Sequence, residues 1–401
     1  MKKENSKFFL LLLLGMLTAF GPFVTDMYLP SLPSMGEYFS ATSSQVQLGL
    51  TTSMIGLAVG QVLFGPLSDR YGRRKPLIVA MWMFLASTLL CLFSQDIFQF
   101  AAFRLVQGIA GAGGIVISRS VAADKFTGRE LAKMLAVIGA INGVAPVAAP
   151  IVGGVFTNLI GWKGIFCILL GLGVILLACS YRFRESLPAE RCSMARFSDM
   201  FHSFRMVLSD RQYMAYVLQF AFAQGVLFAY IASSPFIIQQ HYGYSPLVFS
   251  VCFAINAMAI GVAAALSVRF HRALSSTLSG CVAMLVLALA ECLALMHRCS
   301  FWVYEALLFA LLFGMGLTFT STTALAMECQ RSNAGMASAL LGAMGFALGG
   351  IVSPLVGLGD IMHATGLTFV VCSLGSLSCA LIALGRRRVR LYFSFSTSQK
   401  R

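Results

Sequence analysis

The chain has 401 residues, of which 58% are hydrophobic and only 11% are charged, and its mean hydropathy is +0.82. A soluble domain carries roughly 25% charged residues, so this composition excludes an ordinary soluble enzyme, a disordered chain and a disulfide scaffold, and it predicts a polytopic membrane protein. The net charge of +14 comes from short basic clusters between apolar runs. No basic domain is left to hold a duplex, so we expect no nucleic-acid partner and attribute the clusters to membrane topology.

Twelve apolar runs are each long enough to cross a bilayer as a helix, which takes about 20 residues. In lipid each run must satisfy its own backbone, so helix is the only reasonable state. The runs are residues 8–30, 45–67, 77–94, 97–119, 131–157, 161–181, 213–239, 247–268, 274–296, 301–327, 336–359 and 362–385. The first run follows three lysines, as a secretory signal would, but it continues to Asp26 without a clear cleavage site, so we expect an uncleaved helix.

The basic residues indicate an orientation. With the N-terminus placed inside, 26 of the 29 Lys and Arg residues fall in inner loops and tails, and only Lys163 and Arg298 fall outside. This asymmetry predicts that both termini are cytoplasmic.

The longest inner loop divides the chain. It covers residues 182–212 and separates an N-terminal half of six helices, residues 1–181, from a C-terminal half of six, residues 213–401, which ends in a basic cytoplasmic tail. Phe197, Phe201, Phe204 and Leu208 recur in this loop at helical spacing. The loop is therefore either a short amphipathic helix on the inner surface or a plain linker.

The first helix carries a single acid, Asp26, and the fourth carries Arg104. A low-dielectric environment pushes a carboxylate towards its neutral form, whereas a nearby arginine favours the ionised form. Opposed effects of this kind suit a group that gains and loses a proton as its access to solvent changes. We therefore expect Asp26 and Arg104 to couple protons.

Arg104 belongs to a polar face of its helix. Arg104, Gln107, Gly108 and Gly111 follow one another at spacings that place them on one side. A cation at membrane depth is costly unless it is paired or hydrated, so this face is expected to look into the bundle. A buried structural ion pair is the alternative reading.

The loop between the second and third helices carries an acid among bases. Gly65, Pro66 and Gly72 predict a sharp turn here, and Asp69 stands beside Arg70, Arg73, Arg74 and Lys75. The excess of basic residues in inner loops explains the arginines and the lysine but not Asp69. An acid at this position could lie at the N-terminus of a neighbouring helix or pair with an arginine.

The fifth helix is rich in glycine and proline. Gly139, Asn142, Gly143, Pro146, Pro150, Gly153 and Gly154 lie within 16 residues. At this density a helix is expected to kink and to let a neighbour approach closely, although simple tight packing would use the same residues.

Four strings of residues resemble one family. Residues 65–74 resemble the loop signature G-x-L-x-D-R-x-G-R-R of the major facilitator superfamily, and residues 104–108 resemble its R-x-x-Q-G pattern. Residues 143–154 look like the antiporter motif of its drug:proton exporters, which sugar importers usually lack. Residues 25–30, T-D-M-Y-L-P, resemble the signature of the Bcr/CflA drug-resistance transporters.

The resemblance implies an all-α membrane protein with twelve transmembrane helices in two six-helix halves. It implies a monomer in the lipids of the bacterial inner membrane that exports small amphipathic drugs, similar to chloramphenicol, florfenicol, bicyclomycin or sulfonamides, in exchange for protons by alternating access. Export of a metabolite such as an amino acid, peptide or sugar is the alternative. Some multidrug relatives carry a second acid two turns before Asp26, where this chain has Thr18, so we expect one acid in the first half.

The resemblance also implies residue roles. Gly65, Asp69, Arg70, Gly72 and Arg73 correspond to a conformational latch, in which Asp124 would pair with Arg73 and Asp69 would act near Gly335. Gly143, Pro146, Pro150, Gly153 and Gly154 correspond to the antiporter motif.

The drug site is expected near the membrane midplane, where aromatic surface and sparse hydrogen-bonding groups suit an amphipathic ligand. The candidate residues are Tyr28, Gln107, Asn142, Phe222, Gln224, Tyr230, Asn256 and Phe319, and ordinary helix packing is the alternative for each. Glu291 and Glu305 lie near outer helix ends, where hydration is the common outcome, and Glu291 is the next candidate for a proton carrier.

Other classes of protein fit poorly. The scattered histidines and the absence of a C-x-x-C pair in the sequence argue against a metal site, and we expect no cofactor. No phosphate-binding loop is present for an ATP-driven pump. A membrane enzyme would need catalytic groups converging at one depth, and a channel would show no uphill flux.

Overall fold

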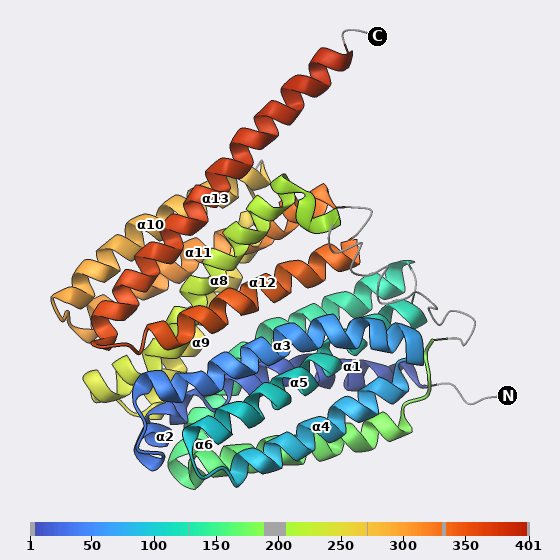
Figure 1. The fold of residues 1–401 in the computed structure, drawn as a ribbon, viewed down its shortest axis with the longest axis vertical. Helices are drawn as coiled ribbons and strands as arrows, with labels where there is room; N and C mark the ends of the chain where they lie inside the picture. The colour runs from blue at the N-terminus through green and yellow to red at the C-terminus, as the bar shows by residue number, and fades with distance from the viewer. Residues whose placement is uncertain (1–4, 127, 188–205, 271, 331–333, 399–401) are drawn as a thin grey trace. The chain divides into compact units, whose positions relative to one another are not determined.

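The computed structural model describes residues 5–126, 128–187, 206–270, 272–330 and 334–398, and its elements are almost all helices (Figure 1). In chain order they are α1 (Lys7–Asp26), the 3₁₀ turn η1 (Leu29–Ser31), α2 (Leu32–Tyr38), α3 (Ser43–Tyr71), α4 (Arg74–Leu92), α5 (Ile97–Lys125), α6 (Gly128–Arg182), α8 (Arg211–Phe236), the π-helical turn η3 (Ile237–His241), α9 (Pro246–Ser267), α10 (Ala273–Met296), α11 (Phe301–Cys329), α12 (Ala334–Leu355) and α13 (Ile361–Ser398). Most of the segment predicted to be either an amphipathic helix or a linker, including Phe197, Phe201 and Phe204, lies outside the described residues.

Eleven helices in the described part of the chain are long and apolar enough to cross a membrane. One of them, α6, has 55 residues, which is about 80 Å of helix and more than twice the roughly 30 Å hydrocarbon core. Its helical geometry breaks at Gly161, where φ is 64° and ψ is −175°. Counting α6 as two crossings brings the eleven helices to the twelve runs of the sequence, and the protein is a multi-pass membrane protein.

The chain packs as two compact units whose boundaries do not simply follow chain order. Unit 1 consists of Met1–Phe197, Ile231–Ala254 and Ser353–Leu358, and unit 2 of Ser198–Tyr230, Ile255–Val352 and Gly359–Arg401. The end of α8, the start of α9 and the end of α12 therefore belong with the first six predicted crossings.

Close approach of α3 and α5 organises unit 1. A Cβ atom added at Gly56 would overlap the carbonyl oxygen of Leu105, and one added at Gly108 would overlap that of Ser53. Small residues allow membrane helices to pack backbone against backbone. Arg104, one turn before Gly108, is thereby held against α3.

The first crossing is broken just after its acid. Helix α1 ends at Asp26, and the chain continues through Met27 and Tyr28 into η1, which has Pro30 in its first turn. Proline disfavours helical geometry in the residue before it and cannot donate a backbone hydrogen bond. The T-D-M-Y-L-P string thus places Asp26 at a helix end rather than within a continuous helix.

Of the three residues predicted to form the turn between the second and third crossings, only Gly72 does so. Helix α3 runs through Gly65 and Pro66 to Tyr71, and the chain turns at Gly72, which has φ of 83°. Pro66 does not end the helix because one missing backbone donor is tolerated in a membrane helix whose neighbours satisfy the backbone. Only Gly72 has the left-handed conformation that favours glycine.

Unit 2 contains α10 packed against both α11 and α13. A Cβ atom at Gly280 of α10 would lie 2.8 Å from the carbonyl oxygen of Gly314 in α11, so these two helices also approach through glycine. Helix α13, red in Figure 1, continues well beyond the end of α10.

Candidate transport site

Arg104 is the largest fully buried side chain of the described residues. Its guanidinium carbon lies 4.4 Å from the centre of the Tyr28 ring and 5.9 Å from that of Phe166. Its Nε donates a hydrogen bond to the Gly49 carbonyl oxygen at 3.4 Å, and its Nη1 donates to the Gln107 amide oxygen. The buried cation is thus stabilised by aromatic faces and polar oxygens, which are the partners expected for a charge at membrane depth.

Gln107 connects this arginine to a third helix. While its amide oxygen accepts from Arg104, its Nε2 donates to the Thr88 hydroxyl of α4 at 2.7 Å. The predicted polar face of α5 therefore points into unit 1, as an intramembrane charge requires.

Asp26 is buried at the end of α1, with 8% of its surface exposed. Arg104 lies near enough to act on it electrostatically. Among the described ion pairs, however, none joins the two residues within 4 Å. The structure therefore brings the acid and the base into one neighbourhood without direct pairing, which leaves the carboxyl able to change its protonation without losing a salt bridge.

The glycine- and proline-rich part of α6 lies against the segment that carries Asp26. A Cβ atom at Gly153 would overlap the carbonyl oxygen of Met27, the residue after Asp26, and it would lie 3.4 Å from Pro30. A Cβ atom at Gly154 would overlap the hydroxyl of Ser250 in α9. Pro150 is buried and Pro146 half-buried. The side chains of Asn142 and residue 143 lie outside the described part.

Several buried polar atoms in unit 1 have no hydrogen-bond partner among the described residues. They include Thr51 Oγ1 and Ser53 Oγ of α3. Buried polar atoms in proteins are nearly always paired with protein or water. These polar atoms could therefore form hydrogen bonds with water or with the polar groups of a ligand, in the unit that holds the positive charge of Arg104. Sequence reasoning missed Thr51 and Ser53, although a polar run within an apolar helix was the available signal.

Arg73 makes the most side-chain contacts in the loop between α3 and α4. Its Nε donates to Asp124 Oδ2 at 2.8 Å, and its Nη1 donates to Asp69 and to the Ser68 hydroxyl. Burial opposes the charge of Arg73, but hydrogen bonds to Asp124 and Asp69 outweigh it and raise the pKa of Arg73 above its ordinary value. Asp124 is the better buried partner, since 14% of its side chain is exposed against 54% for Asp69.

The remaining residues of the predicted latch have different surroundings. Arg70 is exposed and lies over the Tyr71 ring at 5.5 Å. A Cβ atom at Gly65 would meet nothing within 4 Å. The predicted partner region of Asp69 around Gly335 falls outside the side chains that the structure describes.

Glu185 is a further part of this loop that sequence reasoning missed. Its carboxylate accepts hydrogen bonds from the backbone N–H groups of Arg73 at 2.8 Å and Arg74 at 3.0 Å, at the start of α4. A Cβ atom at Gly72 would lie 2.6 Å from the same carboxylate. A carboxylate at a helix N-terminus is favourable. Glu185 is more than 100 residues away from Arg73 and Arg74 along the chain, so the sequence pattern did not predict this contact.

The drug-site candidates in unit 2 fall into two groups. Tyr230 and Asn256 are buried and adjacent, with 3.5 Å between Tyr230 Oη and Asn256 Nδ2. Phe222, Gln224 and Phe319 instead fill helix contacts: the Phe222 ring abuts Gly375, Gln224 abuts Gly345, and the Phe319 ring lies 5.4 Å from that of Phe220. The first group offers polar atoms, and the second shows the pattern expected of helix packing.

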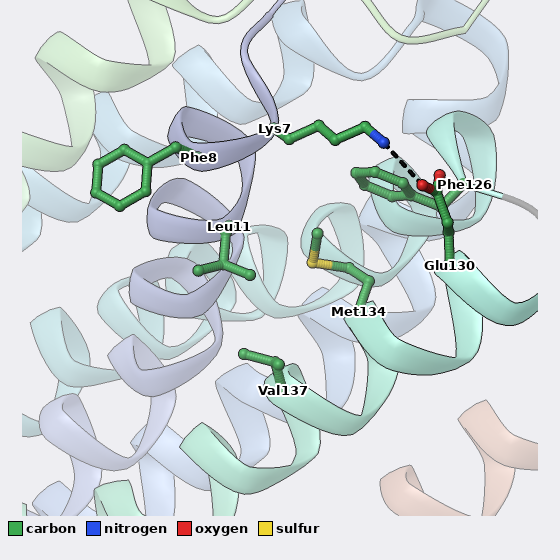
Figure 2. Close-up of a pocket in the computed structure, with 7 residues that line it drawn as sticks. All are labelled: Lys7, Phe8, Leu11, Phe126, Glu130, Met134 and Val137. Atoms are coloured by element: carbon green, nitrogen blue, oxygen red, sulfur yellow. Dashed lines mark hydrogen bonds and ion pairs between the residues drawn. The ribbon is translucent and has the colours of Figure 1, made fainter.

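A cavity of about 310 Å³ lies at one end of unit 1 between α1 and α6 (Figure 2). Its lining is mostly apolar and includes Leu11, Phe126, Met134 and Val137, while Lys7 forms an ion pair with Glu130 at 2.7 Å. Both charged side chains are largely exposed, so the pair adds little stability. None of the predicted proton or drug residues lines this cavity.

Comparison with known proteins gives the family. The Major Facilitator Superfamily matches residues 11–354. The MFS-type transporter YdgK of Bacillus subtilis (strain 168) is 38% identical over 386 residues, which cover 94% of this chain and 95% of that protein. The bicyclomycin resistance protein homolog of Haemophilus influenzae is 28% identical over 369 residues, covering 89% and 90% of the two chains.

A solved structure shows the same fold. A bacterial homolog of the human lysosomal transporter Spinster, in an inward-facing and occupied conformation, aligns with a TM-score of 0.75 at 15% identity, over 96% of this chain and 98% of that chain. The protein is thus a transporter rather than an enzyme, and the chain belongs to the Major Facilitator Superfamily.

Proposed function

We propose that the protein exports small amphipathic drugs in exchange for protons by alternating access. The similarity to a bicyclomycin resistance protein homolog supports the substrate class. One structural observation carries the coupling: Gly153 of the antiporter motif lies directly against the carbonyl of Met27, next to Asp26. A rearrangement of α6 must therefore move the backbone that holds the acid, or be moved by it.

Asp26 is the proposed proton carrier and Arg104 its electrostatic partner. The arginine cannot lose its proton in a protein, so it provides a fixed charge beside a titratable group. When water reaches Asp26 from one side the carboxyl ionises, and when the site is dry the neutral acid is favoured. Gln107 and Tyr28 hold the guanidinium in place, and their side chains with Thr51 and Ser53 offer polar groups to a drug.

The proposal also covers the localisation and membrane orientation of the protein. The chain lies in the bacterial inner membrane as a monomer surrounded by lipid, with both termini in the cytoplasm. The excess of Lys and Arg on the inner loops supports this orientation. In this orientation Arg73, Asp69 and Asp124 form a cytoplasmic latch, and their ion pairs would be broken and remade during the cycle.

Transport of a chloramphenicol-like drug into inverted membrane vesicles tests the proposal. The membrane potential supplies about 2.3 kcal/mol per charge per 100 mV, whereas an electroneutral exchange would draw only on the pH difference. Uptake should appear when respiration energises the vesicles and vanish when a protonophore collapses both gradients. Uptake that survives the protonophore but stops when ATP is removed contradicts the proposal. Proton-driven uptake of an amino acid, peptide or sugar, with no uptake of the drug, would favour metabolite export.

A further inference from the structure

A continuous set of aromatic rings in unit 1 leads from Arg104 to the surface. This aromatic cluster consists of Tyr28, Tyr38, Phe39, Phe100, Trp162 and Phe166, and its neighbouring ring centres lie between 4.9 Å and 6.5 Å apart. Aromatic pairs attract each other at such separations. The rings come from the ends of α1 and α2, from α5 and from the second crossing of α6, so the cluster joins four segments to one buried cation.

The inner end of the cluster surrounds Arg104. Tyr28 and Phe166, both fully buried, lie near its guanidinium carbon at 4.4 Å and 5.9 Å. Phe100 lies one turn before Arg104 on α5 and contacts the backbone at Gly49, where an added Cβ atom would lie 2.8 Å from the ring. The carbonyl oxygen of Gly49 accepts the Nε–H of Arg104. Three rings therefore contact either the guanidinium group or its hydrogen-bond partner.

Trp162 packs behind these rings. Its ring centre lies 5.9 Å from those of both Phe100 and Phe166, and it meets them edge to face, at interplanar angles of 84° and 83°. Trp162 directly follows the break at Gly161, so the second crossing of α6 begins with this buried indole. None of the described cation–ring contacts joins Trp162 to Arg104. An effect of Trp162 on Arg104 must therefore pass through the rings between them.

The outer side of Trp162 is held as well. Its ring centre lies 5.4 Å from that of Tyr38 and 5.5 Å from that of Phe39, at the end of α2. The exposed Lys163 donates a hydrogen bond from Nζ to the Tyr38 hydroxyl at 2.8 Å, and Nζ lies 5.5 Å from the centre of the Trp162 ring. Trp162 is thus fixed between the end of α2 and the rings that contact Arg104.

The place of the Arg104 guanidinium matters because Asp26 is not paired with it directly. The interaction between two charges depends on their separation and on the medium between them. Arginine has a long side chain with considerable rotamer freedom, and the described hydrogen bonds from Arg104 go only to Gly49 and Gln107. The aromatic cluster supplies the remaining restraint on this side chain.

We propose that Trp162 is a positioning residue for Arg104: through Phe100 and Phe166 it fixes the guanidinium group, and so the strength with which Arg104 acts on Asp26. The positioning of Arg104 follows from packing alone. Its part in transport rests on the proposed exchange of drug for protons.

Nuclear magnetic resonance of arginine Nε–H groups tests the positioning without drug, in full-length protein with isotope-labelled arginine in detergent. The Arg104 signal is the one that disappears in Arg104→Lys, and it should exchange slowly with solvent because the group is buried. Trp162→Leu should shift this signal and speed its exchange about tenfold. Trp162→Phe keeps a ring and should change little. Trp302→Leu is the matched control, since Trp302 is 74% exposed, and should change nothing.

The Nε–H of Arg73, which donates to Asp124, distinguishes positioning from a general loss of stability. Its exchange should stay as in wild type when Trp162→Leu speeds that of Arg104. Unchanged exchange at Arg104 overturns the proposal, and so does equal acceleration at both arginines. If Trp162→Leu does not fold, Phe39→Leu removes a half-buried ring that contacts Trp162. It should also speed the exchange of Arg104, and no change in that variant then overturns the proposal.

Proton-driven drug efflux tests the consequence for transport. Trp162→Leu should lower efflux by about fivefold when Arg104 is present but by less than about twofold in an Arg104→Lys background, because residues that act through one another are not additive. Equal loss in both backgrounds would show that Trp162 serves packing alone, which overturns its action through Arg104. Absence of drug efflux by wild type contradicts the proposed function, while the Nε–H exchange still decides the positioning of Arg104.

Discussion

Two buried polar centres in this molecule handle charge in opposite ways. The Arg104 centre, made of Arg104, Asp26, Gln107 and Tyr28, has a permanent cation stabilised by ring faces and amide and carbonyl oxygens. The Glu291 centre, made of Glu291, Glu305 and Asn256, has acids and an amide but no described cation paired with Glu291.

A cation beside a buried acid changes what the acid can do. Beside a fixed cation, an acid that loses its proton leaves a balanced pair of charges, so its ionised form is accessible at membrane depth. Without a cation, an acid stays neutral by keeping a proton. We therefore expect the Arg104 centre to change charge during transport and the Glu291 centre to remain protonated until water enters.

The largest expected effect is at Asp26. Asp26→Asn keeps the shape of the side chain and removes its titration, so proton-driven efflux should fall to the level of cells without the protein while the protein still inserts. Asp96→Asn is the matched control, because Asp96 caps α5 through hydrogen bonds from Phe98 and Gln99, and asparagine is an equally good cap. If Asp26→Asn protein releases as many protons on drug addition as wild type, the comparison fails and Glu291 becomes the principal carrier.

Substitutions at Arg104 test whether transport depends on the positive charge or on the planar geometry of the guanidinium group. Arg104→Lys preserves the charge but loses the planar fork that contacts Tyr28, Gly49 and Gln107, so we expect about a tenfold loss of efflux, equivalent to ~1.4 kcal/mol. Arg104→Ala also removes the charge beside Asp26 and should be more severe. Drug-induced proton release, measured as a function of pH, compares Arg104→Lys and Arg104→Ala with wild type. Equal loss in the two variants would show that the charge itself is irrelevant.

Gly153 tests the contact between the antiporter motif and the Asp26 segment. In Gly153→Ala the new methyl group would overlap the Met27 carbonyl, so α6 must shift at a cost of about 1–3 kcal/mol, and we expect a several-fold loss of efflux with a lower unfolding temperature in detergent. Gly171→Ala lies in the second crossing of α6, after the break at Gly161, with nothing within 4 Å of the new atom, and should behave as wild type. Normal efflux by Gly153→Ala would remove the structural basis for coupling.

Weaker effects are expected in the loop between α3 and α4. Asp69→Asn weakens an ion pair with Arg73 in which Asp69 is exposed, and such pairs contribute about 0.2–1 kcal/mol, so transport should slow at most several-fold with little change in drug affinity. Asp124→Asn should slow it more, because Asp124 is the better buried partner. Equilibrium drug binding by Asp69→Asn should be measured together with transport. If binding and transport fall by the same factor, Asp69 belongs to the drug-binding site instead.

The sequence predicted the helices and the burial of Arg104 because both follow from the cost of polar groups in lipid. Membrane spans need about 20 apolar residues, and an isolated arginine must face inward. These rules act along one helix at a time and need no knowledge of its neighbours.

Contacts between distant parts of the chain were not predictable in the same way. The hydrogen bonds of Glu185 to the start of α4 and of Asn256 to Glu305 depend on how helices rotate against each other. Periodicity gives the face of a helix but not its partner. Pro66 was expected to take part in the turn that Gly72 makes, but it lies within α3, because proline is tolerated within a membrane helix whose neighbours satisfy the backbone.

The break in α6 at Gly161 has a consequence for how the protein enters the membrane. Residues 128–160 and 162–182 are joined by one non-helical glycine, so almost no polar chain has to be carried across the bilayer between them. The two crossings can therefore leave the translocation channel together, as a helical hairpin, before later segments are synthesised. Gly161 has φ of 64°, and a residue with a side chain would cost about 1–2 kcal/mol in this conformation. That cost would fall on the hairpin before it has formed contacts with the other helices.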